Sequence, residues 1–113
     1  MRIYRYMEKI TRIYKALSDG TRLRIVNILQ GKRLCVNRIA EVLGIQQAKV
    51  SRHLFYLKNV GLVNSERDGL RVYYTLPDNR LSKNVLKPLR EIRKDVKELN
   101  DDAQRLVSQK SCC

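Results

Sequence analysis

Histidine is almost absent from this chain of 113 residues, which has a single imidazole at His53. A metal or catalytic site that needs several imidazoles is therefore excluded within one chain. Long apolar runs are also absent. No uninterrupted run approaches the roughly 18 residues of a membrane span, and charges break the N-terminal segment too often for a secretory signal. We expect a cytoplasmic protein without a membrane partner.

Cysteine is scarce, with three residues in the chain. Their number is odd and they lack the spacing of a disulfide scaffold, which favours a reducing compartment with reactive or metal-binding thiols. The residue patterns that support catalysis are missing as well. The sequence has no glycine-rich phosphate loop, no second histidine and no nucleophile in a GxSxG setting. We therefore expect a binding protein rather than an enzyme.

Acidic residues are few, since 11 of them stand against 24 lysines and arginines, which gives a formal net charge of +13. The excess is concentrated in residues 1–76, with 15 basic and 5 acidic side chains, whereas residues 77–113 have 9 and 6. Such a balance favours a polyanionic partner. The length fits one domain over residues 1–108, small enough for a second copy to complete its core. Residues 109–113 form a cysteine-bearing tail.

Apolar residues recur at helical spacing along the first half of the chain. In the fourth of these helices, Val50, Leu54 and Leu57 share one face, which leaves the polar side chains of the other face exposed. Gly44 supplies the turn between the third and fourth helices, so residues 36–60 form a helix-turn-helix. The expected helices span residues 1–18, 21–31, 36–43 and 46–60.

Residues 62–76 contain two short β-type runs around Asp68 and Gly69, a strong hairpin signal because both residues tolerate positive φ. A helix-turn-helix followed by a hairpin predicts a winged helix-turn-helix. This fold is mainly α with a small β-hairpin wing, in the order α-α-α-α-β-β-α. Residues 82–107 are expected to form one last helix with an apolar residue at every third or fourth position. Pro88 kinks this helix or marks its start.

Residues 1–18 and 82–107 each carry an apolar seam that a single helix cannot bury. We expect these seams to pair with each other and with those of a second copy, which gives a two-fold homodimer through the first and last helices. Two DNA-reading helices would then lie about one DNA turn, roughly 34 Å, apart on a palindromic site. A helix pair within a monomer is the alternative.

Polar side chains of the fourth helix and the hairpin are the candidates for DNA contact. Glutamine binds adenine through two hydrogen bonds, arginine and lysine bind guanine edges or phosphates, and wing arginines reach phosphates or the minor groove. Gln46 is alternatively a helix cap, and His53 is alternatively a packing residue. Phe55 either packs under the last helix or is exposed. The candidates are Gln46, Gln47, Lys49, Ser51, Arg52, His53, Arg67 and Arg71.

Four segments within residues 16–76 occur in a characteristic order: ALSDGTRLRI, LCVNRIAEVLG, KVSRHLFYLKNVGLV and RDGLRVYYTL. Together they resemble the ArsR/SmtB family of metal- and stress-sensing repressors, of the arsenical-resistance type. The resemblance implies a homodimeric winged-helix repressor with double-stranded operator DNA as its partner. It also implies that the ligand-free protein binds DNA and that an inducer releases it.

The resemblance also bears on the inducer. In arsenical-sensing members, two cysteines at the start of the third helix bind trivalent arsenic or antimony. Here Cys35 takes the first position, but Asn37 takes the second, and an amide is a poor ligand for a thiophilic ion. Members that bind zinc on the last helix use histidine, which is missing after His53. Because Cys35, Cys112 and Cys113 supply three thiolates, we expect As(III) or Sb(III) as inducer and no structural metal.

Two alternatives share this fold. A persulfide or redox sensor would join Cys35 to Cys112 or Cys113 through a disulfide or polysulfide bridge. A ligand-independent architectural DNA-binding protein would use none of the thiols. In that case Cys35 is a small buried hydrophobic residue and the C-terminal pair is a functionless end of the chain.

Overall fold

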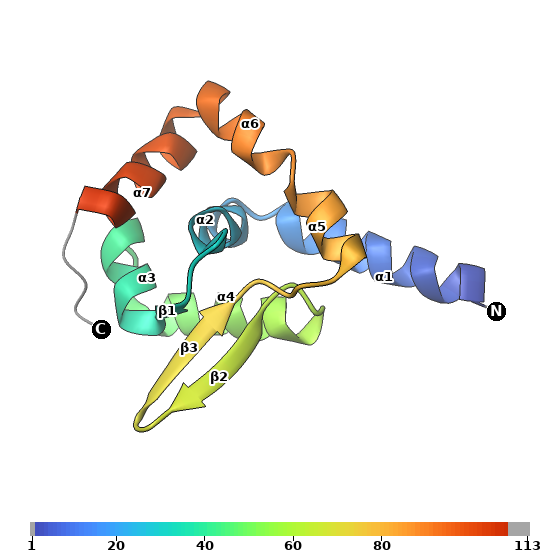
Figure 1. Ribbon diagram of the computed structural model, residues 1–113, viewed down its shortest axis with the longest axis horizontal. Coiled ribbons are helices and arrows are strands. Elements are labelled where there is room, and N and C mark those ends of the chain that lie inside the picture. Colours follow the sequence, from blue (N-terminus) through green and yellow to red (C-terminus); the bar gives the residue numbers. More distant parts are fainter. Residues whose placement is uncertain (1, 109–113) are drawn as a thin grey trace.

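The computed structural model describes residues 2–108 and consists of helices around a small sheet (Figure 1). The helix-turn-helix is formed by α3 and α4, and the hairpin of β2 and β3 projects away from the helices. The elements are α1 (Arg2–Leu17), α2 (Gly20–Leu29), β1 (Leu34–Cys35), α3 (Val36–Leu43), α4 (Gln47–Asn59), β2 (Asn64–Asp68), β3 (Arg71–Thr75), α5 (Arg80–Leu86), α6 (Leu89–Asp95) and α7 (Lys97–Ser108).

The core lies between α2, α3 and α4, where Ile25, Ile39 and Leu54 are completely buried. Local signals in the sequence set the ends of these helices. The carboxylate of Asp19 caps α2 by accepting a hydrogen bond from the backbone N–H of Arg22 at 3.0 Å. These capped helices form a stable base for the helix-turn-helix.

Gly44 ends α3 in the left-handed conformation, with φ of 67°, as expected for the turn between two helices. The backbone N–H of Ile45 then bonds to the Ala40 carbonyl at 3.1 Å, which closes the turn. Gln46 occupies the N-cap position of α4, but its side chain makes no capping hydrogen bond. The alternative prediction that Gln46 caps the helix is thus confirmed for its position, although the cap lacks a side-chain hydrogen bond.

The sheet has three strands in the order β1-β3-β2, rather than the two strands of the predicted hairpin. The additional strand is β1, which pairs with β3 through Leu34 and Tyr74. The tip also differs by one residue. Asp68 pairs with Arg71, so the two turn residues are Gly69, with φ of 66°, and Leu70. Glycine at the first turn position suits a type II′ turn, which allows Asp68 to remain in the strand.

The single last helix predicted over residues 82–107 is wrong, because α5, α6 and α7 replace it. Pro88 lacks a backbone N–H and lies between α5 and α6, so the predicted kink is a full break. A second break lies at Val96, which is extended, with φ of −118° and ψ of 102°. The apolar seam is therefore interrupted, with Leu99 buried but Ile92 and Val96 exposed.

Helix α1 packs on the core through Ile13 and Ala16, both completely buried. Part of its predicted seam remains exposed, since Met7 and Tyr14 are 57% and 59% accessible. An exposed apolar face on a terminal helix suits a contact with another chain. Across residues 2–108, no helix combines the length and the apolar character needed to cross a membrane.

Candidate nucleic-acid interface

Helix α4 separates into a packed face and an exposed polar face. Val50, Leu54 and Leu57 are completely buried against the core, as the sequence predicts. The opposite face carries the candidate DNA-binding residues, and five of them are exposed: Gln46, Gln47, Lys49, Ser51 and Arg52. Within residues 2–108, no hydrogen bond or ion pair occupies these five side chains. Their donors and acceptors are therefore available to a partner.

His53 lies apart from this exposed face and is half-buried. Its Nδ1 atom is 3.5 Å from Nη1 of Arg22, at the start of α2. Burial lowers the pKa of His53 below its ordinary value, the Asp19 carboxylate opposes that change, and the Arg22 guanidinium adds to it. The imidazole is thus neutral near pH 7, and its surroundings resemble those of a packing residue more than those of a phosphate ligand.

Arg22 fixes α4 against the preceding helices. Its Nε donates a hydrogen bond to the Ala16 carbonyl at 2.8 Å, and its guanidinium lies 4.1 Å from the centroid of the Tyr56 ring. A cation over an aromatic face is a stabilising contact. Arg22 thus connects α1, α2 and α4.

Phe55 is exposed, with 67% of its surface accessible, which decides between the two positions that the sequence left open. It follows Ser51 by four residues and Arg52 by three, so the three side chains share one face of α4. Sequence reasoning did not name Phe55 as a DNA contact. The helical spacing contains the signal, because Phe55 lies opposite the buried stripe.

The wing presents Arg67 and Arg71 on its exposed strands, on either side of the tip. Both acidic residues of the wing are engaged by Arg33, since Asp68 accepts a hydrogen bond from it at 3.1 Å and Glu66 lies 3.7 Å from its Nε. The Arg33 guanidinium also stacks on Tyr73, at 3.8 Å from the ring centroid. Arg33 thus supports the wing from its base and reduces the local negative charge near the two candidate arginines.

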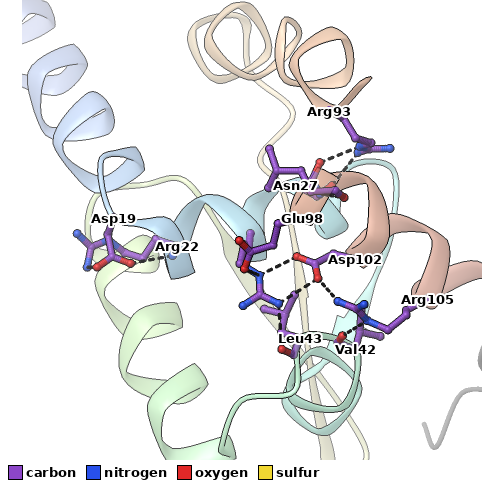
Figure 2. Close-up of polar contacts among 11 residues, drawn as sticks. Asp19, Arg22, Asn27, Val42, Leu43, Arg93, Glu98, Asp102 and Arg105 are labelled. Atoms are coloured by element: carbon purple, nitrogen blue, oxygen red, sulfur yellow. Dashed lines mark hydrogen bonds and ion pairs between the residues drawn. The ribbon is translucent and has the colours of Figure 1, made fainter. Parts of the chain in front are cut away.

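A buried carboxylate joins α7 to the helix-turn-helix. Asp102 is completely buried and accepts two hydrogen bonds from Arg24 of α2, from Nε at 2.8 Å and from Nη2 at 3.0 Å. It also pairs with Arg105 (Figure 2). The same two arginines donate to carbonyls at the C-terminal end of α3, those of Leu43 and Val42. We call this group the Asp102 clamp.

The Asp102 clamp has physical consequences for α3 and α7. Carbonyls at a helix C-terminus lack partners within the helix and carry partial negative charge, so arginines stabilise them. The hydrogen bonds to Asp102 raise the pKa of Arg24 above its ordinary value. Since α3 leads directly into the turn before α4, the position of α7 is coupled to that of the candidate DNA-binding helix.

Two further arginines hold the C-terminal helices to the core. Arg93 donates to the side-chain oxygen of buried Asn27 at 2.8 Å, and Asn27 in turn donates to the Leu99 carbonyl at 2.9 Å (Figure 2). Arg38 is 3% exposed and donates to the Leu106 carbonyl at 2.8 Å. These arginines are structural because buried polar groups at the helix contacts need partners.

The charges of α6 pair within the helix. Lys94 contacts Glu91 at 3.1 Å and does not pair with Glu98, four residues later. The break at Val96 ends the helix before Glu98 and so removes the helical geometry that an i,i+4 pair requires. Glu98 instead lies 3.4 Å from Nε of Arg24, beside the Asp102 clamp.

The cysteines are only partly described by the structure. Cys35 is 6% exposed, lies at the N-cap position of α3 and is disulfide-bonded. Cys112 and Cys113, the other predicted metal ligands, lie outside the described residues. Within residues 2–108, no three side chains of histidine, cysteine, aspartate or glutamate are grouped to hold a metal ion. Any thiol site of the predicted kind therefore involves the tail.

Residues 19–65 match the family model described as "Bacterial regulatory protein, arsR family". The chain is also 35% identical over 86 residues to an uncharacterized HTH-type transcriptional regulator from Methanocaldococcus jannaschii, a match that covers 75% of this chain and 96% of that protein. The chain belongs to the ArsR family. The family resemblance noted in the sequence is confirmed, and the family consists of DNA-binding transcriptional regulators rather than enzymes.

Two other comparisons place the chain within the ArsR family. It is 37% identical over 79 residues to a cadmium resistance transcriptional regulatory protein CadC homolog from Staphylococcus aureus, covering 69% of this chain but only 65% of the relative. The homodimeric winged helix-turn-helix DNA-binding domain of Mb0332 from Mycobacterium bovis has a TM-score of 0.71, with 28% identity, covering 83% of this chain and 86% of that one. The predicted winged helix-turn-helix fold is thereby confirmed.

Proposed function

We propose that this ArsR-family chain is a homodimeric repressor that binds a palindromic DNA operator and releases it through chemistry at its cysteine thiols. The observation that carries the proposal is the exposed polar face of α4, whose side chains have no partners within residues 2–108. In this proposal, Gln47 and Arg52 contact base edges, while Lys49 and the wing arginines contact phosphates. Gln46 and Ser51 add hydrogen bonds, and His53 orients α4 from its packed flank.

The homodimer is supported by the exposed apolar face of α1, on which Tyr6, Met7 and Tyr14 are each more than half accessible. Ile92 and Val96 add exposed apolar surface on the C-terminal helices. The related Mycobacterium bovis domain is homodimeric. A two-fold dimer would give two copies of α4 the spacing that a palindromic site requires.

For the inducer, we propose As(III) or Sb(III) bound by the thiolates of Cys35, Cys112 and Cys113. Three soft sulfur ligands suit a thiophilic ion. The name of the staphylococcal relative refers to cadmium resistance, and Cd²⁺ also prefers thiolates. The absence of a three-ligand group within residues 2–108 is consistent with a site that draws on the tail.

A mechanism for release follows from the Asp102 clamp. Cys35 lies at the start of α3, and residues 109–113 follow α7, while Arg24, Asp102 and Arg105 join α7 to the end of α3. An ion that bridges Cys35 to the tail would act on α3 and α7 together. It releases DNA if it binds the conformation without DNA more tightly, typically by 1–3 kcal/mol of coupling.

Reversible thiol oxidation is the second candidate, because Cys35 is disulfide-bonded in the structure. In this case a disulfide or polysulfide bridge, rather than an ion, joins α3 to another cysteine. One thiolate would attack an inorganic polysulfide, which gives a cysteine persulfide and releases the shortened polysulfide. The second thiolate would then attack the cysteine sulfur of the persulfide, which forms the disulfide and displaces hydrosulfide. A dithiol would reverse the bridge by thiol–disulfide exchange. Both candidates act through Cys35 at the start of α3. They differ in the reagent that closes the bridge, so parallel titrations with different reagents separate them.

Titration of a preformed DNA complex tests the inducer. We expect reduced protein to release its operator at micromolar arsenite or antimonite, and the double variant Cys112→Ser/Cys113→Ser to remain bound, because two of three thiolates are removed. Fluorescence anisotropy of labelled DNA measures release, with Cd²⁺ and polysulfide as parallel titrations. Release by polysulfide alone would contradict the metalloid proposal and favour thiol oxidation. Insensitivity to all of these reagents would favour an architectural protein.

Phe55 provides a test of where α4 lies on DNA. An exposed phenylalanine beside Arg52 suits contact with the methyl group of thymine in the major groove. We expect substitution of uracil for thymine within the half-site to weaken wild-type binding by about threefold to tenfold, an apolar contact of about 1 kcal/mol. The variant Phe55→Ala should bind the two DNAs equally. A variant that still prefers thymine would place the methyl contact elsewhere.

A further inference from the structure

A cavity of about 400 Å³ is lined by neither α4 nor Cys35. It is formed where the C-terminal end of α2, the link from β3 to α5, and the α5–α6 junction meet. Its apolar lining consists of Leu76, Pro77 and Leu86. Its volume falls in the range of small-molecule sites, roughly 300–1,000 Å³, so it is large enough for a small organic ligand.

The same cavity is also lined by three cations, Lys83, Lys87 and Arg90, and by a single carboxylate, that of Asp78. Asp78 is paired with Lys83 at 2.5 Å. The ammonium group of Lys87 has no ion-pair or hydrogen-bond partner within residues 2–108. The lining of the cavity therefore carries an excess of positive charge.

Gln30 also lines the cavity and holds Arg90 in place. Its Oε1 accepts a hydrogen bond from Nε of Arg90 at 3.1 Å. The other guanidinium N–H groups of Arg90 have no hydrogen-bond partner within residues 2–108. They are therefore available to an anionic ligand.

We propose that this cavity binds a small amphipathic carboxylate. The carboxylate lies near Lys87 and Arg90, while the apolar tail packs on Leu76 and Leu86. A planar group with two oxygens suits the guanidinium of Arg90. A dianionic phosphate is disfavoured because the ionised Asp78 carboxylate also lines the cavity, and the Lys83 hydrogen bond lowers the pKa of Asp78.

The position of the cavity gives the ligand a regulatory role, and this part rests on the proposed DNA-binding function. Leu76 and Pro77 connect the wing to α5, whereas Gln30 ends α2 and Arg90 belongs to α6. A ligand that contacts all three segments fixes the base of the wing relative to the C-terminal helices. If DNA binding favours one of these arrangements, the carboxylate changes DNA affinity, and DNA changes carboxylate affinity by the same factor.

Calorimetry on the full-length protein tests the site, with sodium octanoate as the probe and 1-octanol and inorganic phosphate as partial probes. We expect octanoate to bind once per chain and at least about tenfold more tightly than either partial probe. The variant Lys87→Gln should weaken octanoate binding by about fivefold or more. The control Lys94→Gln removes an equal charge from exposed α6 outside the cavity and should change binding by less than about twofold.

Four results would overturn the site: no octanoate binding, equal binding of 1-octanol, equal binding of phosphate, or unchanged affinity in Lys87→Gln. The regulatory role is measured separately, as a change of at least about threefold in DNA affinity at saturating octanoate. Octanoate that binds without altering DNA affinity would overturn only that role. A protein that binds no DNA would overturn the proposed function, while calorimetry without DNA would still decide the carboxylate site.

Discussion

Replacing Arg24 by alanine is expected to lower the free energy of unfolding by about 3–5 kcal/mol, the usual cost of removing one partner of a buried ion pair. The variant leaves Asp102 completely buried with Arg105 as its remaining cation. It also removes the donor to the Leu43 carbonyl at the end of α3. Urea unfolding at one fixed protein concentration measures the change, because the stability of the proposed dimer would depend on concentration.

Lys94→Ala is the matched control for Arg24→Ala. Lys94 also belongs to an ion pair, with Glu91 at 3.1 Å, but its side chain is 72% exposed and that of Glu91 is 78% exposed. Exposed pairs of this kind contribute about 0–1 kcal/mol, so the control should unfold almost as the wild type does. If both variants lost the same small amount of unfolding free energy, the Asp102 clamp would not stabilise the fold as described.

Replacing Arg52 by alanine is expected to weaken operator binding by about 1–3 kcal/mol for each half-site, or roughly fivefold to 150-fold. The side chain is exposed in the middle of α4 and has no partner within the described part of the chain. Removing it would therefore delete the proposed DNA contact without breaking an internal hydrogen bond or ion pair. Anisotropy titrations on an operator selected from random-sequence DNA measure the loss.

The form of this loss identifies what Arg52 contacts. A base contact should weaken only the selected operator, whereas a phosphate contact should weaken all sequences equally and reduce the salt slope by about one. The control is again Lys94→Ala, which removes one positive charge from an exposed site on α6. An Arg52 variant that binds both operator and unrelated DNA like the wild type would exclude α4 residue 52 from the interface.

The first part of the fold follows closely from the sequence because its signals are local. The predicted third helix has the same limits as α3, and Gly44 ends it with positive φ. The buried face of α4 is the one that the spacing of Val50, Leu54 and Leu57 predicts. Helical periodicity and glycine conformation depend on neighbouring residues, so one sequence is enough to interpret them.

The sequence was a poorer guide wherever long-range contacts decide the structure. The repeat of apolar residues over 82–107 is regular, yet the three helices do not form one continuous apolar face. Instead, Leu99 and the polar Asp102 are both buried, and Asp102 bonds to Arg24 of α2. The choice between one helix and three depends on tertiary packing, which outweighs periodicity once Pro88 has broken the helix. In the same way, pairing with β3 makes Leu34 and Cys35 a strand, although their own pattern is too short to predict one.

By itself, the sequence determined the family, the helix-turn-helix and the polar face of α4, because these depend on residue type and spacing within one segment. It also determined the composition of the thiol set, one cysteine before α3 and two at the C-terminus. Only the tertiary structure decided that Arg22, Arg24, Arg38 and Arg93 are structural rather than available to DNA. An arginine is the same residue in the sequence whether it is structural or binds DNA. Only folding brings it next to the carboxylate, amide or carbonyl that accepts its hydrogen bonds.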